Sequence, residues 1–517
     1  MLGALISIGL VGCFVLTCCK NAFKRPPNFP PGPPSLPVYG SYWIILAAAY
    51  NNLALAFKRI GSWYNTKLVG SVMGKIPSVI VNDPGMIKDM LLKPELDGRM
   101  DIILGRLRAF WKRRGIFFTD GYFWHVQRRF SLRYMRDYGF GRRSATLEQV
   151  VESEIKELID IRLNGPKSDA EREMVKGDLV FLPHFLAPPF INGVLHVCSR
   201  MSLPREKYGT VWELAKGALL FQQNSNDLGG AITYTPWLKD VLPNYSGYSG
   251  LRKGNQVLID FFTGLVEEVI ATFDPSHSRH FLDEYVRQMY KDNGEKGEKG
   301  EKGKSTYSKE QLILTCTDYM FPAASATEAV LSMLLEILLV HPELQDRIHE
   351  EIDRVVGSGR LPNLDDRNKM PFTEACIREA MRVDTLVPLG VPHRATQPTT
   401  FHGYDIPEGT MFHANYLMLH KDKDIWGDPD TFRPDRFIVD GKLDVSKDRS
   451  LPFGAGRRLC AGETFARQTM FQVFAGIMQS FRVEKAPGCA PIPATRLQGI
   501  ITTIPDYWIK LTPRRYD

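Results

Sequence analysis

Residues 452–462, which read PFGAGRRLCAG, are the strongest constraint on what this chain can fold into. The positions that define the pattern FGxGxRxCxG are Phe453, Gly454, Gly456, Arg458, Cys460 and Gly462. Residues 463–481 follow with apolar positions at helical spacing and no proline, which predicts a helix directly behind the cysteine. The glycines have no Cβ, so the backbone can pass close to a large flat ligand.

Cys460 stands at the mouth of this predicted helix. Free backbone N–H groups and the positive end of the helix dipole favour a thiolate there. A thiolate that serves as the axial ligand of haem iron donates electron density for oxygen activation, and Arg458 is suited to pair with a haem propionate. An isolated buried cysteine is more often a small core residue, so it is the complete spacing that favours the ligand interpretation.

The segment resembles the haem-binding loop of the cytochrome P450 family. The resemblance implies that Cys460 ligates the iron and that Phe453, Arg458 and Gly462 lie against the haem. It also implies haem b, iron-protoporphyrin IX, as the cofactor. Other segments of the chain match the same family.

The composition is that of a large globular protein. With 517 residues, of which 44% are hydrophobic, the chain can bury one large core or two smaller ones. Three of the eight cysteines lie near the N-terminus and the others form no CxxC pair, which indicates a reducing compartment. The net charge of +7 suits an acidic protein partner or an anionic membrane surface, and it is too diffuse to indicate nucleic acid.

Residues 1–20 are predicted to be a membrane anchor. Residues 1–19 carry no charge and are mostly apolar, and a bilayer-spanning helix needs about 20 such residues. Lys20, Lys24 and Arg25 follow at once and indicate that the next domain lies on the cytoplasmic side. The alternatives fit less well, because a signal peptide has a charged start and a small-residue cleavage site, and a mitochondrial transit peptide is amphipathic and rich in Arg and Ser.

Residues 21–40 are predicted to be a proline-rich hinge, and residues 41–517 a single catalytic domain. The closely spaced prolines favour a semi-rigid extended connector, which resembles the hinge of microsomal cytochromes P450. Within the domain, 43–57 is apolar enough for an amphipathic helix. The stretch 69–81 alternates like short strands, with Pro77 as the marker of a sheet edge.

Trp124 and Arg128 stand out in the basic and aromatic region 101–143. They lie four residues apart, on one face of a predicted helix. In the P450 family, a WxxxR pair on this helix donates its indole N–H and guanidinium to a haem propionate, and the resemblance assigns that role to these residues. The alternatives are a core tryptophan and a solvated arginine face. Residues 160–290 contain no motif that names a ligand.

Residues 308–340 read as one long helix that ends at His341 and Pro342. In the family, this helix crosses the oxygen-binding face of the haem. It carries a kink of small residues, followed by an acid and a threonine that relay protons to bound oxygen. In this sequence Ala323 and Ala324 stand at the kink.

The acid–alcohol pair of the family is absent from its usual place. Ser325 stands at the acid position and Ala326 at the threonine position, followed by Thr327. Pro322 removes one backbone hydrogen bond and should widen the kink. The residues expected to line the oxygen site are Ala323, Ser325, Ala326 and Thr327.

This departure leaves three interpretations of the oxygen site. Ser325 or Thr327 can act together with water, the substrate can supply its own hydroxyl, or the enzyme can rearrange a peroxide without splitting oxygen. The first two retain monooxygenase chemistry. They are favoured because general-acid catalysis needs a correctly held proton source rather than a particular residue type.

Glu379 and Arg382 form an ExxR pair at helical spacing, where a charge-assisted hydrogen bond can form. Arg436 follows in the segment PDRF. ExxR alone is common, but the order ExxR, PLGVPHR, GYDIPEGT and PDRF resembles the family, in which these three residues form a buried triad. His393 or Arg394 is the corresponding candidate for a propionate partner.

The fold implied by the resemblance is mainly α with a small β domain, with haem between them. Residues 399–415 alternate like two short strands around Pro407 and Gly409. The implied function is a membrane-bound haem-thiolate monooxygenase that oxidises a lipophilic molecule such as a sterol, fatty acid, terpenoid or xenobiotic.

Electrons for this reaction are expected from a partner, because the chain has no complete GxGxxG on a strand–helix turn and no length for a flavin module. The resemblance implies NADPH–cytochrome P450 reductase, with cytochrome b5 as a second candidate. It places the enzyme at the endoplasmic reticulum membrane, with the catalytic domain facing the cytosol. The alternatives are a haem-thiolate isomerase or dehydratase that acts on peroxides without a reductase, and a non-catalytic haem-binding sensor or carrier.

Overall fold

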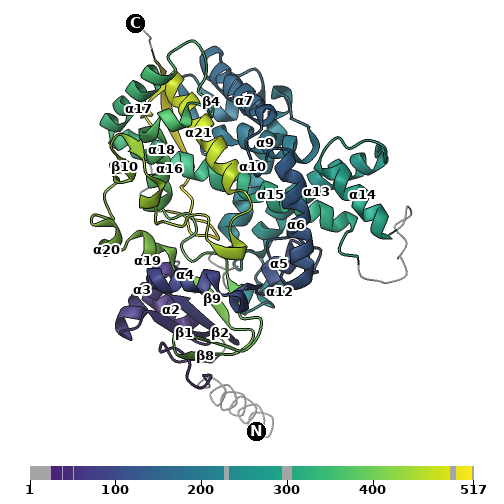
Figure 1. The fold of residues 1–517 in the computed structure, drawn as a ribbon, viewed down its shortest axis with the longest axis vertical. Helices are drawn as coiled ribbons and strands as arrows, with labels where there is room; N and C mark the ends of the chain where they lie inside the picture. The colour runs from purple at the N-terminus through teal and green to yellow at the C-terminus, as the bar shows by residue number, and fades with distance from the viewer. Residues whose placement is uncertain are drawn as a thin grey trace, which may run out of the picture.

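Helices fill most of the molecule, and short strands form small sheets at two places, with β1, β2, β8 and β9 at the N-terminal end and β4 at the opposite end (Figure 1). The computed structural model describes residues 25–37, 39–50, 52–225, 232–293, 305–489 and 496–514. The prediction of a mainly helical fold with a small β part is confirmed for these residues. The anchor predicted at 1–20 lies outside them.

The helical elements follow one another along the whole described chain. The α-helices are α2 (Tyr42–Ala48), α3 (Leu53–Trp63), α4 (Pro84–Leu92), α5 (Ile103–Leu107), α6 (Gly121–Asp137), α7 (Ala145–Asn164), α8 (Asp169–Met174), α9 (Ala187–Ser199), α10 (Tyr208–Asn224), α12 (Leu238–Val241), α13 (Tyr248–Ala271), α14 (Phe281–Asn293), α15 (Lys309–Ala323), α16 (Ala326–Val340), α17 (Pro342–Val355), α18 (Pro371–Val383), α19 (Tyr416–His420), α20 (Lys423–Trp426) and α21 (Glu463–Ser480). The 3₁₀ helices near the site are η2 (His184–Leu186), η5 (Pro434–Phe437) and η7 (Gly456–Arg458).

Two larger sheets and two hairpins contain the strands of the described residues. The first sheet has the order β1-β2-β9-β6-β3, with β2 parallel to β9, and the second has the order β12-β13-β5-β4. The pairs β7-β8 and β10-β11 stand alone. The strands are β1 (Leu68–Met73), β2 (Ile76–Val81), β3 (Gly98–Arg99), β4 (Val175–Lys176), β5 (Leu179–Leu182), β6 (His393–Arg394), β7 (Thr399–Phe401), β8 (Tyr404–Ile406), β9 (Met411–Ala414), β10 (Ile438–Val439), β11 (Lys442–Leu443), β12 (Phe481–Lys485) and β13 (Tyr507–Pro513).

The strands near Pro77 form as predicted, but the role given to this proline was wrong. β2 is an internal strand, since it pairs with β1 on one side and β9 on the other. Its pairing with β9 begins at Ser78, one residue after Pro77. The missing N–H of Pro77 therefore removes no hydrogen bond from the β2–β9 ladder.

Two other predicted stretches are divided more finely than expected. Residues 43–57 belong to two helices, α2 and α3, and the side chain of Asn52 caps α3 by accepting from the Leu55 N–H. Residues 399–415 contain three strands instead of two, because the chain turns back at His402 and Gly403, both with positive φ. Asparagine caps and left-handed turn residues are local signals that hydrophobic alternation does not capture.

The helix predicted at 308–340 is broken. α15 ends at Ala323, and α16 begins at Ala326 after Ser325, whose φ of −131° is not helical. Pro322 lies in the last turn of α15 and lacks the N–H that would bond to the Asp318 carbonyl four residues earlier. By length and composition residues 309–340 could cross a membrane, but most of the apolar stretch is buried within the protein. The kink predicted from Pro322 is therefore a break of two residues, Ala324 and Ser325, between α15 and α16.

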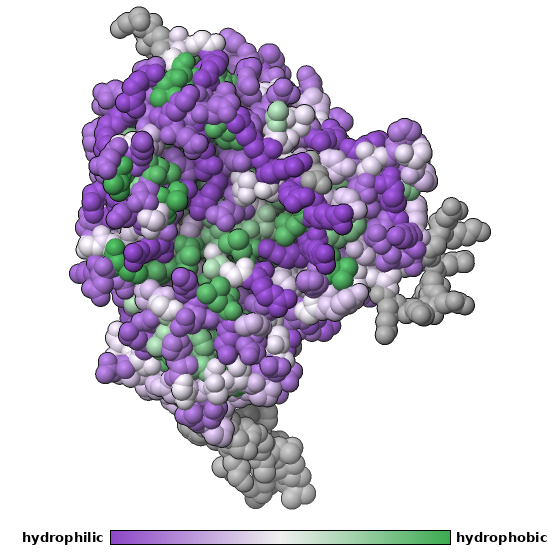
Figure 2. Space-filling view, viewed as in Figure 1, coloured by the Kyte–Doolittle hydropathy of each residue, from purple (hydrophilic) through white to green (hydrophobic). Residues whose placement is uncertain are grey.

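The core surrounds this interrupted helix. α15 packs on α9 and α13, and α16 packs on α18 and α21. On the face in Figure 2, hydrophobic side chains gather in a band where the sheet-rich end meets the helices. The site described next lies at the junction of α15 and α16.

Candidate haem site

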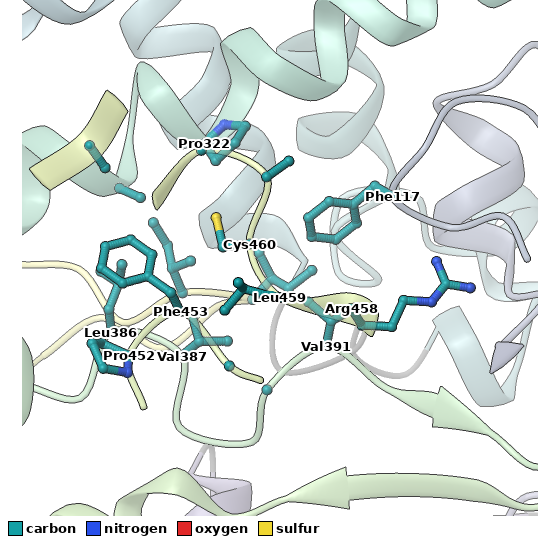
Figure 3. A pocket seen from close by; sticks show the side chains of 18 of the residues that line it. Phe117, Pro322, Leu386, Val387, Val391, Pro452, Phe453, Arg458, Leu459 and Cys460 are labelled. Carbon is teal, nitrogen blue, oxygen red and sulfur yellow. The ribbon is translucent and has the colours of Figure 1, made fainter. Parts of the chain in front are cut away.

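A cavity of about 310 Å³ lies between the loop 452–462 and the junction of α15 and α16. The Cys460 side chain is accessible from it, and Figure 3 shows the sulfur directed toward Pro322. Apolar side chains that line the cavity include Phe117, Phe118, Phe221, Phe321, Leu386 and Val387. The cavity therefore presents a single thiol to a largely apolar space.

Glycines set the path of the loop that carries this thiol. Gly454 and Gly456 have φ of 73° and 68°, where any other L-residue would be strained. A Cβ at Gly456 would also overlap the backbone carbonyl of Leu91. The Cys460 N–H donates to the Phe453 carbonyl at 2.9 Å, which closes the loop.

Two opposing effects act on the Cys460 thiol. Burial raises its pKa, while the backbone N–H groups of Gly462 and Glu463 and the guanidinium of Arg128 act to lower it. The donors expected at the helix mouth are therefore present, but burial is the larger effect in the protein alone. Metal coordination deprotonates a thiol, so iron would complete the formation of the thiolate.

α6 places Trp124 and Arg128 against the loop. The guanidinium carbon of Arg458 lies 3.6 Å from the centre of a Trp124 ring, and that of Arg128 lies 5.6 Å from it. Arg128 also donates to the Leu459 carbonyl, and Arg458 Nε donates to the Asp97 carbonyl at 2.8 Å. The structure thus brings Trp124, Arg128 and Arg458 together at one edge of the cavity, which all three line.

Arg99 joins this cluster, although nothing in the sequence singled it out. It lines the cavity, and its Nε has no hydrogen-bond partner among the described residues. Burial lowers the pKa of Arg99 to about 10, and burial together with neighbouring Arg99 lowers the pKa of Arg458 to about 8. Buried cations need negative partners. A ligand with two carboxylates at its edge, as haem has, would provide them, so these residues fit haem.

His393 and Arg394 have different surroundings. His393 lines the cavity and donates from Nδ1 to the Leu96 carbonyl at 2.7 Å. Burial and then nearby Arg99 hold the pKa of His393 well below its usual value, so its ring is neutral. Arg394 is not among the lining residues, and it pairs with Asp120 at 2.9 Å. Of the two candidates, His393 is the one placed to reach a ligand in the cavity.

Glu379, Arg382 and Arg436 lie together beside the cavity. Arg382 is bidentate to Glu379, with Nε–Oε2 and Nη2–Oε1 distances of 2.8 and 2.7 Å, and Arg436 Nε lies 2.9 Å from the same Oε1. Glu379 and Arg382 are fully buried. Arg382 also donates to the carbonyls of His420 and Pro429, and so ties α18 to the segment before η5.

The four residues expected at the oxygen site face in different directions. Ala323, Ala326 and Thr327 line the cavity, whereas Ser325 does not. The Ser325 hydroxyl donates to the Phe321 carbonyl at 2.8 Å and accepts from Gln222 Nε2 at 2.9 Å. The Thr327 hydroxyl donates to the Ala323 carbonyl at 2.6 Å. Both hydroxyl protons are therefore engaged by backbone carbonyls at the helix break.

A buried ion pair in the cavity wall was missed by sequence reasoning. Asp318 on α15 pairs with Arg108, and its second oxygen accepts the backbone N–H groups of Ile116 and Phe117. One carboxylate thus balances a buried guanidinium and fixes the segment that forms one wall of the cavity. The two residues are far apart in the sequence, so no local spacing signals the pair.

The mainly helical fold places the thiol of Cys460 and the buried arginines at one cavity, and haem would supply a partner for both. Fold and site together define the class of haem-thiolate proteins. Residues 30–511 match the family Cytochrome P450, and the chain belongs to this family. It is accordingly a haem-binding enzyme of the monooxygenase class.

Animal and insect members of the family are similar to this chain over nearly its full length. Cytochrome P450 2J2 of Homo sapiens is 29% identical over 473 residues, which cover 89% of this chain and 86% of the relative. Probable cytochrome P450 303a1 of Drosophila melanogaster is 30% identical over 510 residues, 97% of each chain. Farnesoate epoxidase of Bombyx mori is 27% identical over 500 residues, 94% of each chain.

Proposed function

We propose that the chain is a membrane-bound monooxygenase that uses haem b to hydroxylate or otherwise oxidise an uncharged lipophilic molecule, with electrons from NADPH–cytochrome P450 reductase. The observation that carries this proposal is the cavity, in which the Cys460 thiol faces apolar walls across a space beneath the α15–α16 junction. Haem bound there would supply oxygen activation.

The residues of the chain have separate tasks in this proposal. Cys460 ligates the iron, and Trp124, Arg128 and Arg458 hold the propionates. His393 would join them once a nearby propionate stabilises its doubly protonated ring, because the neutral ring already donates its one proton to Leu96. Arg99 joins them because it is buried beside them and lacks an anionic partner within the cavity wall. The triad of Glu379, Arg382 and Arg436 holds α18 against η5, a 3₁₀ helix that precedes the cysteine loop in the sequence.

An uncharged substrate is favoured by the balance of charge in the wall above the loop. Arg108 is matched by Asp318, and its guanidinium carbon lies 5.7 Å from the ring centres of both Phe118 and Phe321. A substrate carboxylate here would meet Asp318 as well as Arg108, and an unpaired buried charge is costly. The aromatic and aliphatic lining matches sterols, terpenoids and esters of fatty acids.

Asp318→Asn should shift binding toward carboxylate-bearing ligands, because Arg108 loses its counter-charge. A hydrogen bond to a charged group contributes about 1.5–3 kcal/mol, so the ratio of the Kd of a lipid acid to that of its methyl ester should fall at least about tenfold. Haem difference spectra recorded during titration with matched acids and esters measure this ratio. Asp366→Asn, which removes the buried partner of Arg360 outside the lining, should leave the ratio unchanged.

The reductase is proposed to dock on the exposed arginines of α6 and the loop. Arg129 and Arg133 are exposed on α6, and Arg457 is exposed in η7. The same helix touches the loop through Arg128 and Leu459. An acidic partner would be steered toward this side by its charge.

Reversing two of these charges should slow electron delivery without affecting the haem. Arg129→Glu with Arg133→Glu should lower the rate of NADPH-driven haem reduction about tenfold at low salt and less at high salt. Stopped-flow reduction by the reductase measures this rate, and reduction by dithionite should be unchanged. Arg252→Glu with Lys253→Glu, which are exposed on α13, provides the matched control. Equal rates for both double variants would contradict docking on α6.

The proposed function is tested by measuring where the electrons from NADPH go. Purified enzyme, reductase and NADPH are incubated with sterols, terpenoids and fatty-acid esters while NADPH, peroxide and organic product are counted together. Product formed in step with NADPH is the expected result. NADPH going only to peroxide, or lipid peroxides being converted without NADPH, would favour an isomerase or dehydratase instead. Placement at the endoplasmic reticulum membrane, facing the cytosol, is part of the proposal and is tested by fractionation and protease protection.

A further inference from the structure

Glu328 on α16 has a buried carboxylate that the proposed function does not use. It is fully buried, and it does not line the cavity, although its neighbours Ala326, Thr327 and Val330 do. Neither carboxylate oxygen has a hydrogen-bond partner among the described residues. Glu328 therefore lies on the side of α16 turned away from the cavity.

Two titratable side chains connect Glu328 to the surface. Nδ1 of His184, in η2, lies 3.7 Å from Oε1 of Glu328, and its Nε2 lies 4.0 Å from Oδ1 of Asp506. The His184 side chain is 5% exposed and that of Asp506 is 44% exposed. Asp506 immediately precedes β13, so three separate elements bring one row of proton-binding groups from solvent to the first turn of α16.

The oxygen site needs protons that its own lining does not readily provide. Monooxygenation follows RH + O₂ + NADPH + H⁺ → ROH + H₂O + NADP⁺, so two electrons and two protons must reach oxygen for each product. Ser325 and Ala326 occupy the usual acid and threonine positions, and the hydroxyls of Ser325 and Thr327 donate to backbone carbonyls. Asp318, the carboxylate in the lining, is held by Arg108 and two backbone N–H groups.

We propose that Asp506, His184 and Glu328 form a proton relay that delivers protons from solvent to the break between α15 and α16, in place of the missing acid–alcohol pair. This inference rests on the proposed monooxygenase function. Glu328 does not touch the cavity, so it acts through the groups at the break rather than on the substrate.

The first turn of α16 makes the final step possible. Ser325 is the N-cap residue and Glu328 the third residue of the helix, the spacing at which a glutamate side chain can reach back to the N-cap N–H. Rotation of the Glu328 side chain would thus carry a proton from the His184 side to the break. In each passage Asp506 takes one proton from water, His184 passes one to Glu328, and Glu328 passes one to the Thr327 hydroxyl oxygen. Thr327, which lines the cavity, gives up its own hydroxyl proton there. All four groups then return to their starting protonation.

The electrostatics of the row agree with proton transfer near neutral pH. Burial raises the pKa of Glu328, with His184 acting against this, and burial also raises that of Asp506. Burial tends to lower the pKa of His184, but Glu328 and Asp506 outweigh it and the net shift is upward. The other charged group that acts on His184 is Lys216 on α10, which pairs with Glu173. The upward shift brings the pKa of Glu328 closer to neutral pH, where the acid can exchange a proton with the His184 imidazole.

The first test follows the proton itself, without turnover. In the haem-loaded enzyme, infrared spectra across a pH series should show a carboxylic-acid carbonyl band that titrates, disappears in Glu328→Gln and shifts in His184→Gln. Glu154→Gln is the matched control, because Glu154 is another buried acid, bonded to Tyr208 and Asn192 and not lining the cavity. A wild-type-minus-Glu328→Gln difference spectrum without a titrating carboxylic-acid band would overturn the relay, and Glu154→Gln should leave that band in place.

The second test measures coupling. Glu328→Gln should lower the product formed per NADPH about tenfold or more, raise peroxide correspondingly and increase the solvent deuterium isotope effect. Asp506→Asn, an exposed change that spares folding, should act in the same direction with a smaller effect. Glu154→Gln should couple like the wild type. Wild-type coupling in Glu328→Gln would overturn the relay alone, whereas a wild type that yields only peroxide would overturn the proposed function as well.

Discussion

Cys460→Ser should reduce NADPH-dependent product formation to background while the chain still folds. Cys460 is the thiol in the described residues that faces the cavity, and its N–H closes the loop onto Phe453 through the backbone, which serine retains. A serine hydroxyl remains protonated and cannot push electron density onto iron as a thiolate does. The change therefore removes the axial ligand and leaves the loop intact.

The outcome is read from the reduced carbon monoxide spectrum, the haem content and the product yield. The spectrum typical of thiolate-ligated haem should be lost, even where some haem is retained by the arginine cluster. Cys376→Ser is the matched control, because Cys376 is a buried free cysteine on α18 outside the cavity lining. Retention of the thiolate spectrum in Cys460→Ser would mean that another side chain ligates the iron.

The parts of this site that follow from sequence are those with short, fixed spacing. Cys460 lies within a pattern of adjacent glycines, and Glu379 and Arg382 lie one helical turn apart. Local geometry dictates such contacts, since a helix brings residues three apart onto one face. The pairing of Arg436 with Glu379 is the exception that required a resemblance to the family.

Contacts between segments that are distant in the sequence could not be predicted from residue spacing. Arg108 and Asp318 meet because the wall segment folds onto α15, and Arg99 becomes buried because β3 pairs with β6. His184 and Glu328 meet because η2 lies against α16. These contacts are made by charged residues that become buried only in the tertiary fold. Composition and periodicity alone assign such residues to solvated faces.

The helix at the oxygen site was predicted only in part, because its proline indicated a kink and the structure contains a break. Pro322 indicated a kink, but a proline alone does not determine whether a helix bends or stops. The break occurs at Ser325, which leaves helical geometry and accepts a hydrogen bond from Gln222 on α10. That partner comes from a region of the sequence without any recognisable motif.

Arg382→Leu should destabilise the folded protein by about 3–5 kcal/mol, because it leaves the buried carboxylate of Glu379 without its bidentate partner. The change also removes donors to the carbonyls of His420 and Pro429, so the segment that leads to η5 loses its tie to α18. Folded proteins are stable by only about 5–15 kcal/mol. A low yield of haem-loaded protein is therefore expected as well.

Thermal unfolding followed by circular dichroism and by haem absorbance measures this effect. Arg172→Leu breaks an exposed pair with Asp169 on α8 and should change stability by only about 0–1 kcal/mol. Combining Arg382→Leu with Glu379→Leu should recover part of the loss, because two apolar side chains leave no buried charge uncompensated, although Arg436 then lacks its partner. An unfolding midpoint for Arg382→Leu equal to that of Arg172→Leu would show that the triad does not lock this part of the fold. Recovery of stability in the double variant would show that the loss in Arg382→Leu comes from the unpaired buried charge of Glu379.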